Sequence, residues 1–469
     1  MPRRKAKRKE FENIRVKDVG SKGKGIANAP DGRIIFIDQA IPGDEVDVLT
    51  YKKRKAYYMA KTTYFHNRSR HRTTPRCVHF GTCGGCKWQH FEYEAQLYYK
   101  EKEVLENLKR IGKLDIKDSH PILGNEEIYF YRNKMEFSFS NKRWLTQDEI
   151  NTEQEIENKT ALGLHIPGMW DKVLDLKECH LQKEPSDDIR LQLKRFADEK
   201  SFTFFDPHEQ TGLLRNVMIR TSRTGQVMVV MQFFNNEPDN IRQIMDFLRD
   251  TFPQIASLQY IINQKKNDSI YDQQVHLYYG CDHIIEKMQD LKFQIRPKSF
   301  YQTNSKQAEI LYARLKELLN LKGDELVLDL YSGIGSIALS LAKDCKKVIG
   351  VEVIEDAVKD ANKNAELNNI DNASFLKGET QDVLNEKLIK RNGRPDIIVV
   401  DPPREGLHKN VVKMIREIHP AKLAYVSCNS ATQARDMEML KDLYSIDHVQ
   451  PVDMFPNTYH TENIVIATS

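Results

Sequence analysis

Hydrophobic and polar residues follow different patterns in the two ends of the chain. Residues 11 to about 65 alternate between apolar and polar positions, and turn residues interrupt the alternation at Gly20, Asp31-Gly32 and Pro42-Gly43. A period of two is typical of strands with one buried face, and short strands between such turns favour a barrel. We therefore predict a small all-β barrel over residues 11–65, preceded by a disordered basic tail over residues 1–10.

The carboxyl-terminal part of the chain instead carries short runs that are apolar almost throughout. These runs cover residues 325–330, 348–352, 396–400 and 423–427, and helical patterns follow the first and the last of them. Continuous apolar strands alternating with helices are typical of a parallel sheet buried on both faces. The pattern predicts a doubly wound, Rossmann-like domain over residues 291–469.

Residues 77–290 lie between these two regions and contain strand-like runs at 131–137 and 212–220. We predict a central β-rich α+β domain here, so that the whole chain is a multidomain α/β protein. Arg132 and Arg220 lie in these two runs, where they suit either contacts with RNA or ion pairs inside the domain.

A glycine turn joins the first apolar run of the carboxyl-terminal domain to its helix. The turn has the sequence Tyr331-Ser332-Gly333-Ile334-Gly335-Ser336, and Glu352 ends the next run about 20 residues later. Such a turn allows a ligand to approach the backbone closely, and an acidic residue at this distance commonly binds ribose hydroxyls. The pattern predicts a nucleoside pocket, although the same spacing also fits the dinucleotide site of a dehydrogenase.

Two further residues are expected at the same edge of the sheet. Asp401 ends the run 396–400, and the prolines that follow it would hold it rigidly beside the cofactor. Cys428 ends the run 423–427, just before a helical pattern. A thiol at that position is a candidate nucleophile, whereas an isolated cysteine is otherwise commonly a small core residue.

An ordered set of motifs then resembles a known family. The set comprises F-Y-Q-T-N at 300–304, L-D-L-Y-S-G-I-G, V-I-G-V-E, V-V-D-P-P-R-E-G, S-C-N at 427–429 and D-M-F-P-N-T-Y-H-T-E. Across residues 296–469 it resembles the RNA uracil-C5 methyltransferases that use S-adenosylmethionine. Ser430 stands where the family usually has proline, and Thr461 where valine is common.

The resemblance implies a role for each matching residue. Cys428 would add to C6 of uracil as a thiolate, which makes C5 nucleophilic enough to accept a methyl group. Glu462 would then remove the C5 proton. The residues that the resemblance assigns to S-adenosylmethionine are Gln302, Tyr331, Glu352 and Asp401.

The seven cysteines include a group with the spacing of metal ligands. Cys77, Cys83 and Cys86 form a tight triplet around glycines, and Cys179 is the candidate fourth ligand. Four thiolates suit either zinc or an iron-sulfur cluster, and His79, His90 and His180 leave a mixed zinc site open. The resemblance favours a [4Fe-4S] cluster over zinc, with a structural or RNA-positioning role.

Positive charge is concentrated at the amino-terminal end. Residues 1–76 hold 20 Lys and Arg against 8 Asp and Glu, although the whole chain has a net charge of only +4. Residues 51–58 interleave four basic side chains with three tyrosines, a pattern suited to phosphate contacts and base stacking. Lys24-Gly25-Ile26-Ala27 and the segment 36–44 resemble the TRAM module, an OB-like RNA-binding barrel.

The function expected from these features is methylation of uridine at C5 in RNA. The TRAM-like barrel together with the cysteine group favours bacterial 23S rRNA as the substrate, and a tRNA T-loop uridine is the alternative. A non-catalytic RNA-binding assembly factor remains a third possibility, and a dehydrogenase would leave Cys428 and Glu462 without a role. Without a signal peptide or a long apolar run, we expect a cytoplasmic protein with no membrane association and no obligate protein partner.

Overall fold

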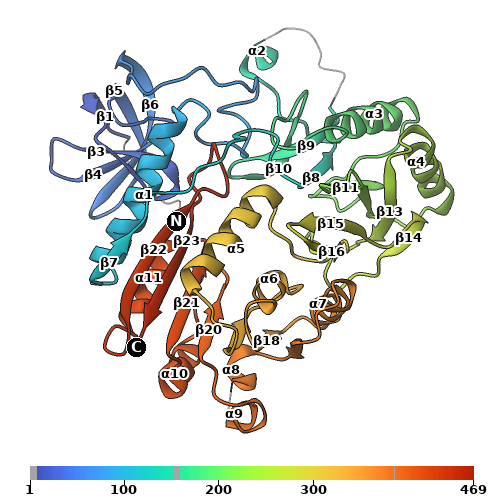
Figure 1. The fold of residues 1–469 in the computed structure, drawn as a ribbon. Coiled ribbons are helices and arrows are strands. Elements are labelled where there is room, and N and C mark those ends of the chain that lie inside the picture. The colour runs from blue at the N-terminus through green and yellow to red at the C-terminus, as the bar shows by residue number, and fades with distance from the viewer. Residues whose placement is uncertain (1–7, 152–158, 385) are drawn as a thin grey trace, which may run out of the picture.

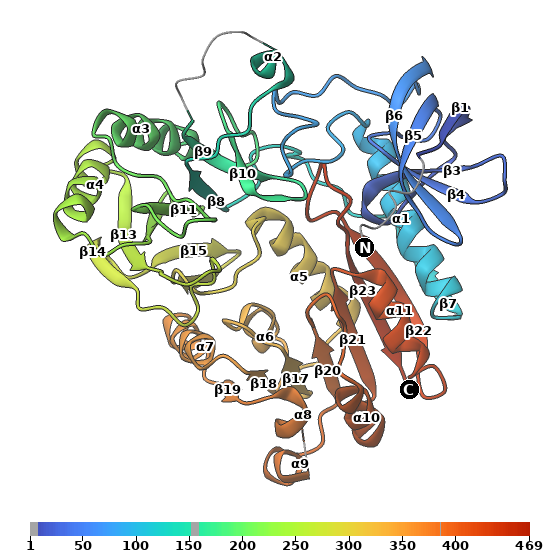
Figure 2. The same ribbon diagram turned by 180° about the vertical axis from the view of Figure 1, so that it is seen from behind.

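Three β-sheets follow one another along the chain in a computed structural model, which describes residues 8–151, 159–384 and 386–469. Figure 1 shows the amino-terminal sheet in blue, the central sheet in green and the carboxyl-terminal sheet in orange and red, and Figure 2 shows them from behind. Most of the predicted basic tail, residues 1–7, lies outside the described residues. None of the helices in the described ranges combines the length and apolarity that crossing a bilayer requires.

The amino-terminal sheet has six strands in the order β1-β5-β6-β4-β3-β2. Its strands are β1 (Glu10–Arg15), β2 (Asp18–Gly20), β3 (Lys24–Asn28), β4 (Ile34–Asp38), β5 (Glu45–Lys53) and β6 (Tyr57–Asn67), and a 3-10 turn, η1 (Ser21–Gly23), follows β2. The alternate residues that the pattern assigned to the inside, such as Ile35, Ile37 and Val46, are completely buried. They form a separate small core beneath this sheet.

Helix α1 (Tyr93–Arg110) connects this sheet to the rest of the molecule. Lys100 of α1 forms a 2.6 Å ion pair with Asp453, and both side chains are fully buried. Asn107, near the end of α1, donates a 2.9 Å hydrogen bond to the hydroxyl of Ser430. Breaking a buried ion pair by removing one partner costs about 3–5 kcal/mol, so these contacts dock α1 firmly.

The central sheet has seven strands in the order β10-β9-β8-β11-β12-β13-β14. Its elements are β8 (Lys134–Ser140), α2 (Gln147–Ile150), β9 (Ala161–Ile166), β10 (Met169–Asp175), α3 (Ser186–Glu199), β11 (Leu214–Thr221), β12 (Val227–Phe233), α4 (Pro238–Thr251), β13 (Ile255–Ile262) and β14 (His276–Gly280). Helices α3 and α4 pack together over one end of it (Figure 1), and their apolar faces share a core with its strands. A two-stranded hairpin, β15 (Ile284–Met288) and β16 (Leu291–Ile295), leads to the third sheet.

The third sheet has eight strands in the order β19-β18-β17-β20-β21-β23-β22-β7. Its strands are β7 (Ile116–Ser119), β17 (Leu326–Leu330), β18 (Lys347–Glu352), β19 (Ala373–Lys377), β20 (Ile397–Val400), β21 (Lys422–Ser427), β22 (Ser445–Val452) and β23 (Glu462–Thr468). Its helices are α5 (Ser305–Leu319), α6 (Ser336–Ala342), α7 (Glu355–Leu367), α8 (Thr380–Val383), α9 (Glu386–Asn392), α10 (Lys409–Ile418) and α11 (Ser430–Glu438).

The order of these strands creates a position for a ligand. Strands β17 to β21 are mutually parallel, and the chain proceeds from β17 to β18 on one side and to β20 on the other. In open α/β sheets, ligands bind at such a switch point, outside the carboxyl ends of the strands. The predicted doubly wound arrangement is therefore present, and its crevice lies beyond Leu330 and Val400.

Candidate active site

The glycine turn lies at the switch point, directly after β17. Tyr331, Gly333 and Gly335 all have positive φ angles, of 68°, 55° and 85°, so the chain turns sharply here. A Cβ atom added to Gly333 would meet no atom within 4 Å, whereas one added to Gly335 would come within 2.8 Å of Phe375. The space over Gly333 is thus open to a ligand, while Gly335 allows the turn to pack on the ring behind it.

Glu352 lies beside this turn with its carboxylate already oriented. One oxygen accepts a 3.0 Å hydrogen bond from the N–H of Gly333, and the other accepts a 2.9 Å bond from the N–H of Ile354. Each carboxylate oxygen can accept a further hydrogen bond, and ribose hydroxyls are suitable donors. Nearby, Asp329 Oδ1 and the Ser332 hydroxyl are buried without a partner among the described residues.

Asp401 and Gln302 are the other two residues expected to bind the cofactor. Asp401 follows β20, and its N–H points at the carbonyl of Leu330 at the end of β17, 3.5 Å away. Gln302 lies in the connection before α5, where its backbone carbonyl accepts a 2.9 Å bond from Asn133. Burial raises the pKa of the Tyr331 hydroxyl, and an interaction with Thr380 acts in the opposite direction.

Cys428 occupies the end of β21, immediately before α11. Asn429 caps that helix, because its side chain accepts a 3.2 Å hydrogen bond from the N–H of Ala431. Ser430 is therefore the first helical residue, a position where proline is common because its N–H has no partner inside the helix. This explains why the departure from the family pattern at Ser430 leaves the loop intact.

Glu462 is brought next to the thiol by strand pairing. Ser427 of β21 lies opposite Asn463 of β23, so the residues that follow and precede them, Cys428 and Glu462, are neighbours across the two strands. Glu462 is buried, and burial and the charge of Asp401 raise its pKa well above the usual value. The low-dielectric surroundings of Asp401 raise its pKa as well. Two carboxylates so close together favour a state in which they share a proton.

The electrostatic setting of Cys428 combines opposing influences. Burial, together with the negative charges of Glu462 and Asp401, raises the pKa of the thiol to about 11. Arg404 acts in the other direction, through its charge and a hydrogen bond to the sulfur. At neutral pH the resting side chain is consequently a thiol, held beside a cation that stabilises the thiolate.

Arg404 and His460 were not among the residues predicted for the site. One guanidinium nitrogen of Arg404 contacts Nδ1 of His460 at 3.1 Å, and its carbonyl accepts a 3.0 Å hydrogen bond from the side chain of Asn429. Burial and nearby cations lower the pKa of His460 to about 4, so it is a neutral acceptor at physiological pH. Both residues lie inside the D-P-P-R-E-G and H-T-E motifs, which are the signal that could have identified them.

The four predicted metal ligands line one small cavity. Cys77, Cys83, Cys86 and Cys179 lie around it together with Leu164 and Leu181. Burial raises the pKa of Cys86 and Cys179 to about 11 and about 12, and the charges of neighbouring cysteines contribute to both shifts. In the described residues, one group of three has ligand atoms all within 4.8 Å of one another, and it contains none of these cysteines.

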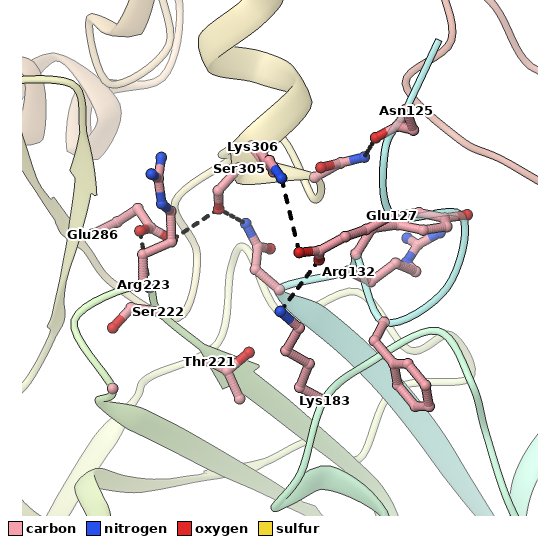
Figure 3. Close-up of a pocket in the computed structure, with 15 residues that line it drawn as sticks. Asn125, Glu127, Arg132, Lys183, Thr221, Ser222, Arg223, Glu286, Ser305 and Lys306 are labelled. Carbon is pink, nitrogen blue, oxygen red and sulfur yellow. Dashed lines mark hydrogen bonds and ion pairs between the residues drawn. The ribbon is translucent and has the colours of Figure 1, made fainter.

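A larger cavity, of about 510 Å³, lies between the central sheet and α5 (Figure 3). Glu127 stands between Lys183 and Lys306 in this view, with N–O distances of 3.2 and 3.8 Å. Arg132 projects into the same cavity, and among the described residues it has no acidic partner within ion-pair distance. Its guanidinium lies 5.9 Å from the ring centre of Phe455, which in turn contacts His460.

The structure limits which amino-terminal residues can contact RNA. Tyr51 is 46% exposed, but Tyr58 is completely buried and donates a 2.7 Å hydrogen bond to Asp31. Arg72 forms two hydrogen bonds to buried Asp44 and therefore holds the fold together. Arg220 is also buried, and it donates to the carbonyl of Ser299. Tyr58 is therefore turned inward although it belongs to the run whose pattern suited RNA contact, and Arg220 is closer to the second of its two open alternatives, an interaction inside the protein.

Comparisons with known proteins agree with this site. A family model described as tRNA (uracil-5-)-methyltransferase matches residues 214–469. Two relatives named as RNA methyltransferases, from Bacteroides thetaiotaomicron and Porphyromonas gingivalis, are 46% and 44% identical, over 96% and 97% of this chain and 99% of each relative. The crystal structure of Pyrococcus abyssi tRNA (uracil-54, C5)-methyltransferase with S-adenosyl-L-homocysteine is 28% identical, with a TM-score of 0.75, and covers 97% of this chain and 99% of that one.

Fold, site and comparisons together define an S-adenosylmethionine-dependent RNA methyltransferase. The dehydrogenase that the glycine turn alone left open is thereby set aside. More particularly, the chain belongs to the tRNA (uracil-5-)-methyltransferase family.

Proposed function

We propose that the protein methylates C5 of a uridine in RNA through a covalent bond between Cys428 and C6 of the base. The observation that carries this proposal is the arrangement of Cys428, Glu462 and Arg404 where β21 ends and β23 begins. A thiol, a buried carboxylate and a cation at the rim of a cofactor crevice are the groups that this reaction requires.

The first step is addition of the sulfur of Cys428 to C6. Arg404 stabilises the thiolate, and the thiol proton leaves to solvent water. The single proton that Glu462 and Asp401 share rests on Asp401, so Glu462 stays a carboxylate for the later step. The new S–C6 bond places electron density on C5 and on the O4 carbonyl of the ring. S-adenosylmethionine, when bound, supplies the methyl group that C5 accepts.

Glu462 acts in the second step. After methylation, C5 carries both a methyl group and a proton, and the aromatic ring returns only when that proton leaves. Glu462, as a carboxylate, takes the proton, the electrons of the C5–H bond re-form the C5–C6 double bond, and the C6–S bond breaks. The buried setting of Glu462 raises its affinity for the proton, which favours this transfer.

Four residues would hold the cofactor against this site. Glu352 is suited to the ribose hydroxyls, and the open space over Gly333 admits the nucleoside. Tyr331, Gln302 and Asp401 would position the cofactor's amino-acid portion. The buried, unpartnered oxygen of Asp329 and the hydroxyl of Ser332 beside the turn support the presence of a polar ligand here.

For the cysteine group we propose a [4Fe-4S] cluster held by Cys77, Cys83, Cys86 and Cys179. A single tetrahedral zinc ion with Zn–S bonds of about 2.3 Å would draw the four sulfurs to roughly 3.8 Å from one another. Among the described residues, no three of these sulfurs lie within 4.8 Å of one another, so they do not present the close arrangement that a single zinc ion would require. The apolar lining, with the N–H of Gly85 donating to the sulfur of Cys83 at 3.4 Å, also suits a cluster.

We further propose that the RNA is 23S rRNA and that the amino-terminal sheet is a TRAM-like RNA-binding module in a cytoplasmic enzyme. The exposed Tyr51 and the basic residues around it support contact with RNA. One observation favours tRNA as a second candidate, because the solved relative from Pyrococcus abyssi is named for uracil 54 of tRNA. In either substrate the uracil must leave its stack to reach Cys428.

The test is to map 5-methyluridine in rRNA and tRNA from cells with and without this protein. Loss of the modified base from 23S rRNA alone would support the first target, and loss from the T-loop alone would support the second. An unchanged content of 5-methyluridine in both RNAs, together with no methyl transfer to either RNA by the purified protein, would contradict the proposed reaction.

A further inference from the structure

We infer that Asp118, His120 and His448 form a binding site for a divalent transition-metal ion of the zinc class, separate from the cysteine group. Among the described residues, this is the group of three whose ligand atoms all lie within 4.8 Å of one another. The inference does not depend on the proposed reaction.

The distances between the three ligand atoms match those around a single ion. His120 Nε2 lies 3.2 Å from His448 Nδ1 and 3.4 Å from Asp118 Oδ2, and the third side of the triangle measures 3.5 Å. An ion with tetrahedral bonds of about 2.1 Å to nitrogen and oxygen separates its ligands by roughly 3.4 Å. The three atoms are therefore already spaced as one face of such a tetrahedron.

Strand pairing explains why these side chains meet. Asp118 of β7 lies directly opposite His448 of β22 in the parallel ladder, and His120 is two residues beyond Asp118. The N–H of His120 donates a 2.9 Å hydrogen bond to the carbonyl of Val449, which extends the pairing past the end of β7. The register of β22 against β23 also shifts between Ile446 and His448, a bulge of the kind that redirects side chains.

The chemistry of the three donors selects the class of ion. Two imidazoles and one carboxylate suit zinc and its neighbours in the transition series, whereas magnesium and calcium prefer oxygen ligands. The side chains of His120 and His448 are 21% and 35% exposed, so water can complete the coordination sphere. The positive charge of Arg314 acts on His120 and would oppose the binding of a cation there. Its 2.6 Å ion pair with Glu317 partly neutralises that charge.

A bound ion would join two segments that are more than 300 residues apart in the chain. Figures 1 and 2 both show β7 along the outer edge of the third sheet beside β22, at the far end of the connection from α1. β7 has only four residues, and backbone hydrogen bonds to one neighbour hold it in place. The ion would fasten this short strand and therefore the docking of α1.

The test compares the full-length protein with its His448→Asn variant in metal binding. We expect the unaltered protein to bind one more equivalent of Zn²⁺ than the variant after buffer exchange, as counted by mass spectrometry of the metal. Co²⁺ as a spectroscopic probe should give weak visible bands at this site, distinct from the intense sulfur-to-metal absorption of any Co²⁺ on the cysteines. We expect affinity in the variant to fall by at least about 100-fold.

Two further variants serve as controls. Asp118→Asn preserves the shape of the side chain and should also lose the extra equivalent, which covers the case in which His448→Asn fails to fold. His208→Ala removes a half-exposed histidine that contacts Asp171 at 3.1 Å and should keep the metal. Equal Zn²⁺ stoichiometry in all four proteins, or no Co²⁺ bands of the weak type in the unaltered protein, would overturn the inference.

Discussion

Cys428 and the four clustered cysteines present the same functional group in two very different surroundings. Cys428 follows the end of a strand, among charged groups. Glu462 and Asp401 raise the pKa of its thiol, and Arg404 lowers it. The clustered cysteines lie around a small cavity with several leucines, and the negative charges that act on them are those of the other cysteines together with Glu178 and Asp187, which disfavour a thiolate. Burial raises the pKa of the thiol in both places.

The difference lies in how each thiol can become a thiolate. Beside Cys428, Arg404 can stabilise the anion while the thiol proton leaves to solvent, so the thiolate forms transiently and reversibly. In the leucine-lined cavity, a cation must supply that stabilisation permanently, and iron would do so. Under the proposed function, the surroundings rather than the sulfur itself would separate a nucleophile from a metal ligand.

The largest expected effect is that of Cys428→Ser. We expect methyl transfer to fall on the order of 10⁴-fold or more, because serine is too weak a nucleophile to add to C6. RNA containing 5-fluorouridine should form a covalent adduct with the unaltered protein at Cys428, seen by peptide mass spectrometry, and none with the variant. An adduct at another residue would contradict the assignment of Cys428 as the nucleophile.

Glu462→Gln should separate the two chemical steps. We expect turnover to fall by about 10²–10⁴-fold, because glutamine cannot accept the C5 proton. Since bond formation at C6 precedes this step, a complex between protein and methylated RNA should accumulate and survive denaturing electrophoresis. A variant that is slow but accumulates no adduct would assign Glu462 to an earlier step.

Arg404→Ala tests the charge that distinguishes Cys428 from the clustered cysteines. Loss of the hydrogen bond to the thiolate should cost about 1.5 kcal/mol, or roughly 10-fold in rate, the low end for a charged bond because Arg404 is exposed. The variant's thiol pKa should lie above the value of about 11 in the unaltered protein, so alkylation by iodoacetamide should need a higher pH. Arg404→Lys, which keeps the charge, is the control, and an unchanged alkylation profile in Arg404→Ala would contradict the assignment.

Cys179→Ser should have the smallest effect on the chemistry. We expect loss of the visible absorption and of the iron content of the anaerobically purified protein, together with a lower Tm. Adduct formation with 5-fluorouridine RNA below the melting temperature should persist, because Cys179 does not touch the crevice. Loss of the adduct in a folded variant would mean that the two groups of thiols act together.

Much of this picture could be predicted from local sequence patterns. Glu352 and Asp401 end apolar runs, and the rules for parallel sheets place such residues at one edge. The contacts that could not be predicted join distant segments: Lys100 with Asp453, Asn107 with Ser430, and β7 with β22. No periodicity in the sequence predicts these contacts, because tertiary packing, and not the adjacent residues in the chain, determines which partner each residue meets.

Exposure was also beyond prediction at individual positions. Tyr58 and Arg220 occur in runs of the expected composition, but their places in the strands direct both side chains inward. Arg404 was not assigned to the site, because its interaction with the thiol depends on how the loop after β20 folds against Asn429.

The buried contacts of α1 have a geometric consequence for how a target is chosen. Since Lys100 and Asn107 fasten this helix to the segments that carry Asp453 and Ser430, the amino-terminal sheet stands at a fixed distance from the sulfur of Cys428. If RNA binds to that sheet, the base that reaches Cys428 would be the one at the matching distance along the RNA. The choice of uridine would then depend on the spacing and shape of the RNA as much as on the neighbouring nucleotide sequence.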